Sequence, residues 1–241
     1  MTKLKHMFQR KEKKYLLSYA DFEQLIVKLG SDLVEDEYGL HTISSLYFDT
    51  EDYDLIRASI EKPDYREKFR LRAYGEPQES TPVFLEIKKK YAGIVYKRRV
   101  AMPLEEVADY IAQPEDKFAS GVERQVSQEI SWLLARKQLE PKVMIAYERR
   151  AFFAPSEPEF RVTFDFNIRY RQEDLQLLSG TEGARVAPEI DVLMEVKALG
   201  AYPIWFAEAL ANLAIYPGSF TKYGQTYQRY LFKKESFQHV I

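Results

Sequence analysis

The sequence predicts an α+β protein built on a closed antiparallel eight-stranded β-barrel, with a charged lumen and helices covering the outside. Two observations lead to this fold. Several segments alternate charged and apolar side chains with period two, so each would form a strand with one charged and one apolar face. These segments follow one another mostly at hairpin distance, with segments of helical period inserted between them. The apolar faces would point outward against the helices, which leaves the charged faces to line a tunnel.

The strands are expected where alternation is regular and where turn residues bound it. In chain order they cover residues 13–17, 42–49, 66–74, 83–89, 93–101, 142–153, 159–171 and 191–198. Residues 90–93 read as the hairpin turn between the fourth and fifth strands. Lys89 and Lys90 are expected to be solvated turn residues, and a role as anion ligands is the alternative. Residues 173–188 carry Gly180, Gly183 and Pro188 and are expected to form a loop.

Helices are expected where apolar residues recur at positions i, i+3, i+4 and i+7 and where capping residues precede them. They cover residues 19–29, 51–59, 103–112, 122–137 and 203–214, and a last helix begins near Thr221. Ser18 would cap the first helix and Gly30 would end it, while Thr50 would cap the second. Ser120 and Glu123 have the spacing of a capping box for the longest helix.

Composition limits both the organisation and the class of function. The 241 residues carry a formal net charge of −2 and show no repeat or linker, so we expect one domain over residues 1–241 and no global field for nucleic acid. The absence of cysteine excludes thiolate chemistry, and the three histidines lack metal-ligand spacing. No signal peptide or membrane-span pattern is visible, which predicts a soluble, cytoplasmic protein.

The charged strand faces carry the functional signal. In the segment 160–171 one face holds Arg161, Thr163, Asp165, Asn167, Arg169 and Arg171, and the other face is apolar. Residues 66–72, 84–88 and 192–197 divide in the same way. Rows of like charge on neighbouring strands repel one another unless an anion lies between them. A compact polyanion is therefore the expected ligand, and we expect Arg70, Arg72, Arg149 and Arg161 to converge on one lumen.

Arginine and lysine side chains are both expected to bind this anion, in different ways. Guanidinium groups can hold phosphate oxygens in a bidentate manner, whereas lysines act as point charges along a chain of phosphates. Alternation from Lys97 places Arg99 inward and Arg98 outward. By the same alternation Arg150 lies on the other face from Arg149, so we expect it to be structural. The candidate catalytic cations are Lys14, Arg70, Arg72, Lys88, Lys97, Arg99, Arg149, Arg161 and Lys197.

Three carboxylates lie among these cations. Glu12, Glu86 and Glu195 each stand two residues before a lysine and on its face. Each could neutralise the row through a lateral salt bridge, or could hold Mg²⁺ or Mn²⁺, which bind through one or two carboxylates together with substrate phosphates. The two roles do not exclude each other. Tyr147, on the face of Arg149, could donate its hydroxyl to a phosphate or could be a packing residue.

A family resemblance rests on eight short blocks in a fixed order. They are Arg10–Tyr15, Tyr47–Asp49, Phe69–Gly75, Glu86–Lys88, Tyr96–Arg99, Tyr147–Phe152, Leu193–Lys197 and Phe220–Tyr223. Together they resemble the catalytic domain of the vacuolar transporter chaperone polyphosphate polymerases. That domain belongs to the triphosphate tunnel metalloenzyme superfamily, with the thiamine triphosphatases and class IV adenylate cyclases. The resemblance runs from about residue 8 to residue 230.

The resemblance implies further roles. It adds Arg10 and Lys222 to the substrate-binding residues, Lys222 from a helix that caps the tunnel, and it makes Glu195 the first choice of metal ligand. The chain starts with Arg-x-Glu-x-Lys where the hydrolases and cyclases carry Glu-x-Glu-x-Lys, which favours the polymerase branch. Phosphate-sensing and membrane-spanning segments of the eukaryotic members are missing, so we expect a stand-alone prokaryotic-type copy with a separate membrane-protein partner.

The expected activity is phosphoryl transfer from ATP to a growing polyphosphate, with Mn²⁺ or Mg²⁺ as cofactor. This chemistry depends on positioning and charge stabilisation, so it needs no nucleophilic side chain of the protein. If water is the acceptor, the protein is an inorganic or nucleoside triphosphatase. A non-catalytic polyphosphate-binding module is the alternative outside enzymes. Nucleic acid is not an expected partner, because the basic residues do not interleave with exposed aromatic residues.

Overall fold

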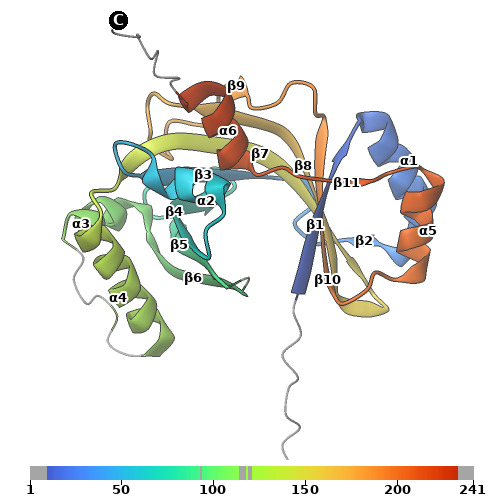
Figure 1. Ribbon diagram of the computed structural model, residues 1–241, viewed down its shortest axis with the longest axis horizontal. Helices are drawn as coiled ribbons and strands as arrows, with labels where there is room; N and C mark the ends of the chain where they lie inside the picture. Colours follow the sequence, from blue (N-terminus) through green and yellow to red (C-terminus); the bar gives the residue numbers. More distant parts are fainter. Residues whose placement is uncertain (1–9, 93, 114–117, 119–120, 233–241) are drawn as a thin grey trace, which may run out of the picture. The chain divides into compact units, whose positions relative to one another are not determined.

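The computed structural model of the protein describes residues 10–92, 94–113, 118 and 121–232 (Figure 1). The described part of the chain is an antiparallel β-sheet with helices, as expected for an α+β fold. Hydrogen bonds join eleven strands in the order β11-β1-β10-β8-β7-β3-β4-β5-β6, while β2 pairs with β7 and β9 with β8. Eight of these strands are long: β1 (Arg10–Leu17), β3 (His41–Asp49), β4 (Tyr65–Tyr74), β5 (Pro82–Tyr91), β6 (Ile94–Pro103), β7 (Glu140–Ala154), β8 (Glu157–Arg171) and β10 (Val192–Leu199).

The prediction of a closed eight-stranded barrel is only partly supported. The eight long strands lie at the predicted places, but three two-residue strands were not predicted: β2 (Val34–Glu35), β9 (Ala184–Arg185) and β11 (Pro217–Gly218). The hydrogen-bonded path ends at β11 and at β6, and no hydrogen bonds join those two ends among the described residues. The sheet is therefore not closed by hydrogen bonds, and the barrel is not confirmed.

The chain forms two compact units, each with its own core. The first unit contains residues 1–42, 147–168 and 187–220, and the second contains residues 43–146, 169–186 and 221–241. Strands β7 and β8 pass through both units. The expectation of one domain over residues 1–241 stays a prediction, and each unit is described below by itself.

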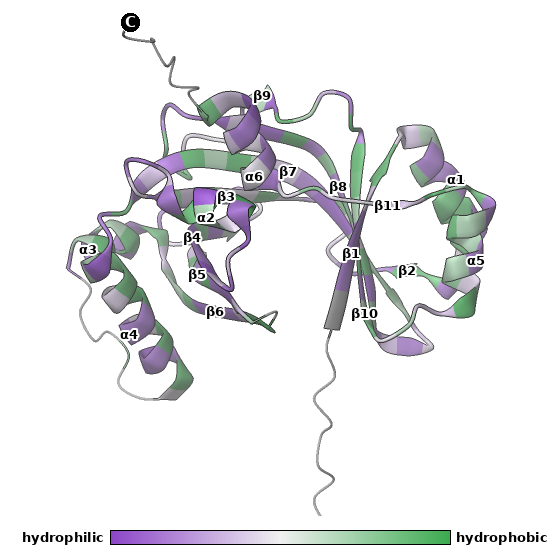
Figure 2. Ribbon diagram, in the orientation of Figure 1, coloured by the Kyte–Doolittle hydropathy of each residue, from purple (hydrophilic) through white to green (hydrophobic). Residues whose placement is uncertain are grey.

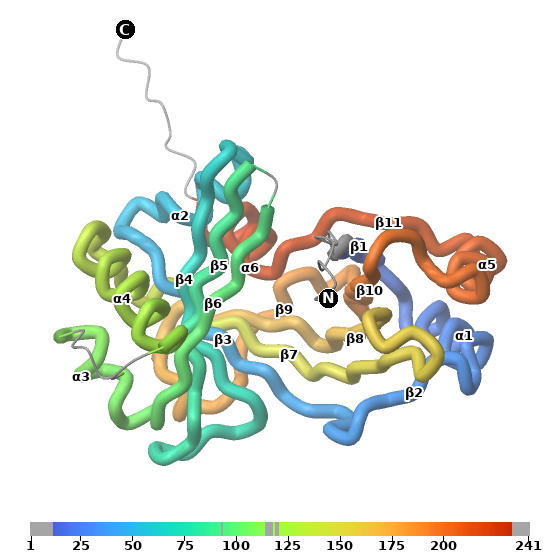
Figure 3. The backbone as a smooth tube through the Cα atoms, turned by 90° about the horizontal axis from the view of Figure 1, so that it is seen from below, coloured from blue at the N-terminus to red at the C-terminus, as the bar shows by residue number. Residues whose placement is uncertain are grey.

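In the first unit, two helices cover the apolar face of β1, β10 and β8. Helix α1 (Tyr19–Leu29) begins with the predicted cap, since the Ser18 hydroxyl accepts from the Asp21 amide at 3.1 Å and the Asp21 carboxylate accepts from the Ser18 amide. Helix α5 (Ile204–Asn212) follows Pro203 and lies beside α1 (Figures 1 and 3). Phe160, Phe164 and Phe206 form the centre of the core that these elements enclose.

In the second unit, three consecutive strands present their apolar face to α4 (Gly121–Arg136). Leu71, Leu85 and Val100 come from β4, β5 and β6, and Ile130 and Leu133 come from the helix. The three strands run alongside one another in Figure 3, and Figure 2 shows both hydrophobic and hydrophilic residues along α4. The apolar face is covered by helices, as predicted, so the charged face is the opposite one. The Ser120 half of the predicted capping box lies outside the described residues.

The remaining helices of the second unit are short: α2 (Asp54–Glu61), α3 (Val107–Ala112) and α6 (Lys222–Thr226), which continues as a π-helical turn through Leu231. Helix α2 begins three residues later than predicted. The buried carboxylate of Asp49 accepts hydrogen bonds from the amides of Leu55 at 2.8 Å and Ile56 at 3.0 Å, so it caps the helix from the end of β3. The preceding residues form a turn with Tyr53 at φ +62°, and Thr50 accepts from the Asp54 amide.

No helix in the described ranges has both the length and the apolar character that crossing a bilayer requires. The predicted cytoplasmic location stays a prediction.

The core of the first unit gives a stability prediction. Phe206 is fully buried between Phe160 and Tyr202, so Phe206→Ala should lower the free energy of unfolding by about 3–5 kcal/mol. Ile204 lies on the same helix but is 77% exposed, so Ile204→Ala should change stability by less than about 1 kcal/mol. Urea unfolding of both variants measures the difference, and equal losses would contradict this packing.

Candidate functional site

The charged face of β4, β5 and β6 concentrates cations around one carboxylate. Antiparallel register places Lys68, Lys88 and Lys97 directly opposite one another, and the next row along the strands contains Arg70, Glu86 and Arg99. Arg72 follows on the same face of β4. We call these seven residues, with Tyr47 of β3, the Glu86 cluster. It lies wholly within the second unit.

Glu86 is buried, with 2% of its surface exposed, and four cations surround it. Arg70 donates to Oε2 from Nε at 2.8 Å and from a terminal nitrogen at 2.6 Å, and Lys97 lies 2.8 Å from Oε1. Arg72 and Arg99 lie further away, at 3.9 and 4.0 Å. Burial would raise the pKa of Glu86, but the charges of Arg70, Arg72 and Lys97 outweigh it and lower the pKa to about 2. Glu86 is therefore ionised at any physiological pH.

One carboxylate cannot balance this face. The Glu86 cluster holds six cationic side chains, and Lys88 is exposed and makes no ion pair within the described part of the chain. Three lysines directly opposite one another repel, which destabilises the sheet unless an anion binds. A hollow of about 30 Å³, lined by Tyr47, Lys68, Arg70, Glu86, Lys88 and Lys97, lies at this point of the face. The arrangement is suited to phosphate oxygens.

Tyr47 connects the cluster to helix α6. Its hydroxyl accepts a hydrogen bond from Arg70 at 2.9 Å, and its ring stacks on Tyr223 with centroids 4.7 Å apart. Tyr223 donates in turn to the carboxylate of Asp49 at 2.9 Å. Burial opposes ionisation of Tyr47, but Arg70, Arg72 and Lys68 outweigh it and lower its pKa to about 8. Lys222 precedes Tyr223 at the start of α6, so it does come from a helix, as the resemblance implied.

A second group of charges lies on β1, β10, β8 and the part of β7 that belongs to the first unit. Lys14 lies 3.2 Å from Glu195 and 3.8 Å from Glu12, so one ammonium group touches both carboxylates. Arg149 pairs with Asp165 through two hydrogen bonds of 2.5 and 2.7 Å and lies 3.8 Å from Glu195. These five residues form the Glu195 cluster. Burial would lower the pKa of Arg149, but Tyr147, Asp165 and Glu195 outweigh it and raise the pKa.

The other predicted residues of this unit lie nearby with different surroundings. Lys197 stands opposite both Glu12 and Arg161 in the register. The side chain of Arg161 is 54% exposed and lies 3.7 Å from Asp36. Tyr147 is buried, and its ring lies 5.2 Å from the Arg149 guanidinium carbon, so it supports that arginine. Arg10 begins β1, and its side chain lies outside the described part of the structure.

The predicted face of each adjacent arginine agrees with its contacts. Arg98 and Lys89 both pair with Glu129 of α4, at 2.8 and 2.9 Å, on the helix side of the sheet. Arg150 holds Glu35 through two hydrogen bonds, as expected of a structural residue. The expectation that Lys89 is a solvated turn residue is wrong, because β5 extends to Tyr91 and Lys89 is a paired strand residue.

The structure adds residues that the candidate set lacked. Lys68 lies two residues before Arg70 on the same face, and Asp165 lies on the face of Arg161. Period-two alternation is sufficient to place both residues on these charged faces. Arg169 and Arg171 were predicted on the face of Arg161. In the structure they hold the loop after β8, through Thr181 and through the carbonyls of Asp174, Gln176 and Gly180. They are structural.

The Glu195 cluster fits a divalent cation better than the Glu86 cluster does. Two of its three carboxylates, Glu12 and Glu195, already share one cation, the Lys14 ammonium. No group of three acidic or histidine side chains suited to a metal occurs among the described residues. Such a site would therefore take few protein ligands and complete its shell with phosphates and water, the usual mode for Mg²⁺. Glu86 is surrounded by four cations, which leaves little room for a further positive charge.

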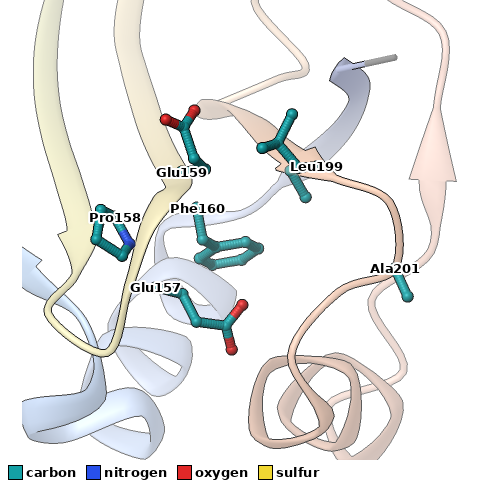
Figure 4. Close-up of a pocket in the computed structure, with 7 residues that line it drawn as sticks. Glu157, Pro158, Glu159, Phe160, Leu199 and Ala201 are labelled. Carbon is teal, nitrogen blue, oxygen red and sulfur yellow. The ribbon is translucent and has the colours of Figure 1, made fainter. Parts of the chain in front are cut away.

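A second hollow does not suit an anion. A shallow pocket of about 230 Å³ in the first unit is lined by Glu157, Pro158, Glu159, Phe160, Ala198, Leu199 and Ala201 (Figure 4). It offers two carboxylates and no cation. The charged faces are therefore the stronger candidates.

Comparison with known proteins shows the family of the chain. The family model of the VTC domain matches residues 9–231, nearly the whole chain. The chain belongs to the VTC domain family. It is 27% identical over 171 residues to vacuolar transporter chaperone complex subunit 4 of Schizosaccharomyces pombe, covering 62% of this chain and 23% of that protein. Subunit 4 of Trypanosoma brucei brucei is 23% identical over 274 residues, covering 86% and 35%. The VTC-domain chain thus spans about a third or less of these relatives.

Solved structures support the wider relationship at the level of fold. A candidate adenylate cyclase of Bacillus halodurans superposes with a TM-score of 0.55 at 16% identity, over 92% of this chain and 99% of that one. A Hippeastrum protein is described as a candidate adenylyl cyclase with a dominant triphosphatase activity. It also superposes with a TM-score of 0.55 at 16% identity, over 91% of this chain and 96% of that one. At this level of identity the likeness shows that the VTC-domain chain shares the fold of these proteins.

Tyr47 supplies a pH-dependent signal for the cluster. Its pKa of about 8 lies below the ~10 of an unfolded tyrosine, so its ionisation favours folding. This contribution is fully present above the unfolded pKa and is lost as the pH falls through about 8. The difference in tyrosinate absorbance between the wild type and Tyr47→Phe should titrate with a midpoint near pH 8. Removing a neighbouring positive charge by Arg70→Gln should raise that midpoint. A difference that titrates near pH 10 in wild type would contradict the proximity of Tyr47 to these cations.

Proposed function

We propose that the chain is a metal-dependent phosphoryl transferase that binds a nucleoside triphosphate or polyphosphate and makes polyphosphate from ATP. One observation carries the proposal: six cations share the face of β4, β5 and β6 with a single carboxylate. Membership of the VTC domain family supports the same ligand class. The relatives named above are subunits of vacuolar transporter chaperone complexes, so a separate membrane-protein partner is part of the proposal.

The residues of the Glu86 cluster would bind and orient the phosphates. Arg70 is held by Glu86 and Tyr47, so its guanidinium is fixed before a ligand arrives. Lys68, Lys88 and Lys97 would supply point charges along the phosphate chain, and Arg99 would add a planar group at the edge. Charge held in place in this way stabilises a phosphoryl group during transfer without a protein nucleophile. Lys222, on the helix that Tyr223 anchors, is proposed as a further ligand.

The residues of the Glu195 cluster would contribute the metal ligands. Glu195 and Glu12 are the proposed ligands of Mn²⁺ or Mg²⁺, and Lys14, Arg149, Arg161 and Lys197 the proposed cations around them. When bound, the metal neutralises charge on the phosphoryl oxygens. Asp165 keeps Arg149 in position through its two hydrogen bonds. Convergence of Arg70, Arg72, Arg149 and Arg161 on one lumen stays a prediction, as do the roles of Tyr147, Arg10 and Glu86.

The direct test is incubation of the pure protein with ATP and Mn²⁺ or Mg²⁺, followed by separation of ADP, free phosphate and polyphosphate. ADP together with polyphosphate supports the polymerase. Free phosphate without polymer means that water is the acceptor and that the protein is a triphosphatase. Tight polyphosphate binding without turnover makes it a binding module, and absence of both contradicts the proposal.

Glu195→Gln tests the metal site. The substitution conserves shape and removes one ligand charge, so turnover should fall by at least about a hundredfold while the melting temperature stays nearly unchanged. Arg149 keeps Asp165 as its partner, which limits the structural loss. Glu35→Gln is the matched control, because it also removes a carboxylate paired with arginine in the same unit. Full activity of Glu195→Gln with either metal would exclude Glu195 as a required ligand.

Tripolyphosphate binding tests the anion site without requiring turnover. At ~100 times its dissociation constant, the ligand should stabilise the protein by about 2.7 kcal/mol and raise the melting temperature accordingly. Arg99→Gln should weaken this effect, whereas Arg98→Gln, on the helix side of the same strand, should not. Arg72 is less suitable because it is buried against Ser45 and Glu86. A melting temperature that millimolar tripolyphosphate leaves unchanged would argue against the site.

A further inference from the structure

The charged face of the second unit continues past the Glu86 cluster toward the β5–β6 hairpin. Arg66 of β4 stands directly opposite Lys90 of β5. Both lie two residues beyond the lysine row, at Lys68 and Lys88, and therefore on the same face of the sheet. Lys90 was expected to be a solvated turn residue, but it is a strand residue with a cation as its cross-strand neighbour.

These outer cations lack acidic partners. Arg66 donates to the Pro63 carbonyl at 2.9 Å, and a guanidinium keeps further donors available. Neither Arg66 nor Lys90 forms an ion pair with a carboxylate in the described ranges of the chain. On the opposite face of the same hairpin, Lys89 and Arg98 share Glu129. A carboxylate thus balances the two cations on the helix face, and none balances Arg66 and Lys90 on the charged face. Like charges directly opposite one another are destabilising.

The cationic face is also longer than a triphosphate. Arg66 and Arg72 are six residues apart on one strand, which corresponds to about 20 Å at ~3.3 Å per residue. Three linked phosphates are shorter than that span. The cations nearest to Glu86 would be enough for a triphosphate, and the outer pair would then have no ligand.

We propose that Arg66 and Lys90, together with Lys88, form a subsite for polyphosphate beyond the third phosphate. The subsite rests on the proposed function, and it would make affinity increase with chain length. A polymer of phosphates is suited to it because every unit carries charge and none carries a base. Arg66 and Lys90 bind and guide the chain, while the residues around Glu86 hold the end that reacts.

Nucleic acid fits this surface less well. Exposed Tyr65, Tyr91 and Tyr96 lie near the hairpin, but alternation places them on the opposite face from Arg66 and Lys90. Single-stranded nucleic acid is held by aromatic side chains that stack bases beside the cations. On the charged face the aromatic side chains are Tyr74 and Phe84, which lie at the other end of the strands against Arg72 and Arg99. The cross-strand register places no aromatic residue beside Arg66 or Lys90 on that face.

The test compares dissociation constants for sodium tripolyphosphate, long-chain polyphosphate and mixed-sequence single-stranded RNA. The double variant Arg66→Gln/Lys90→Gln should weaken the binding of long-chain polyphosphate by about three- to tenfold. It should leave the dissociation constant of tripolyphosphate unchanged. The control is Lys89→Gln/Arg98→Gln, which removes two cations from the other face of the same hairpin and should alter neither constant. Lys90→Gln alone keeps the Arg66–Pro63 contact and should give a smaller loss in the same direction.

The other outcomes are distinct. Unchanged polyphosphate binding in the Arg66/Lys90 variant, or an equal loss for both phosphate ligands, would overturn the subsite while leaving the triphosphate site in place. RNA binding as tight as polyphosphate binding, and equally reduced by the variant, would overturn it in favour of a nucleic-acid surface. If the wild-type protein binds neither phosphate ligand, the proposed function itself fails and the subsite with it.

Discussion

Cross-strand register is the constraint on which the rest of the second unit depends. Because β4, β5 and β6 pair without interruption, Lys68, Lys88 and Lys97 must lie opposite one another, and Arg70 and Arg99 must flank Glu86. A shift by one residue would exchange the two faces of these strands. The charged side chains would then face α4 in place of Leu71, Leu85 and Val100, and the core of the unit would be lost. The apolar contacts with α4 therefore hold the cations in place against their mutual repulsion.

The two clusters differ in their balance of charge. In the Glu195 cluster, Lys14 and Arg149 share three carboxylates, whereas in the Glu86 cluster one carboxylate is shared by its cationic neighbours. The first arrangement presents carboxylate oxygens, and the second presents N–H donors. Each is built from the polar face of strands whose other face forms a core.

Alternation along strands was the reliable signal in the sequence. It separated Arg98 from Arg99 and Arg149 from Arg150, and the contacts of all four agree with it. It could not indicate that Asp49 shares the capping of α2 with Thr50, because a buried carboxylate at the end of a strand leaves no local sequence pattern. Alternation could not predict the two-residue strands β2, β9 and β11 either, because their pairing depends on partners far away in the chain. Whether a sheet closes is likewise a property of long-range geometry.

The order of the cationic strands along the chain has a consequence for how the protein folds. Strands β4, β5 and β6 are consecutive hairpins within residues 65–103, so their contacts are local and can form early. Helix α6, whose Tyr223 anchors Tyr47 and Asp49, comes more than a hundred residues later. The nascent hairpins must therefore bring their lysines together before that helix is available. Folding should consequently slow at low ionic strength and quicken when multivalent anions are present, so the ligand would also act as a folding aid.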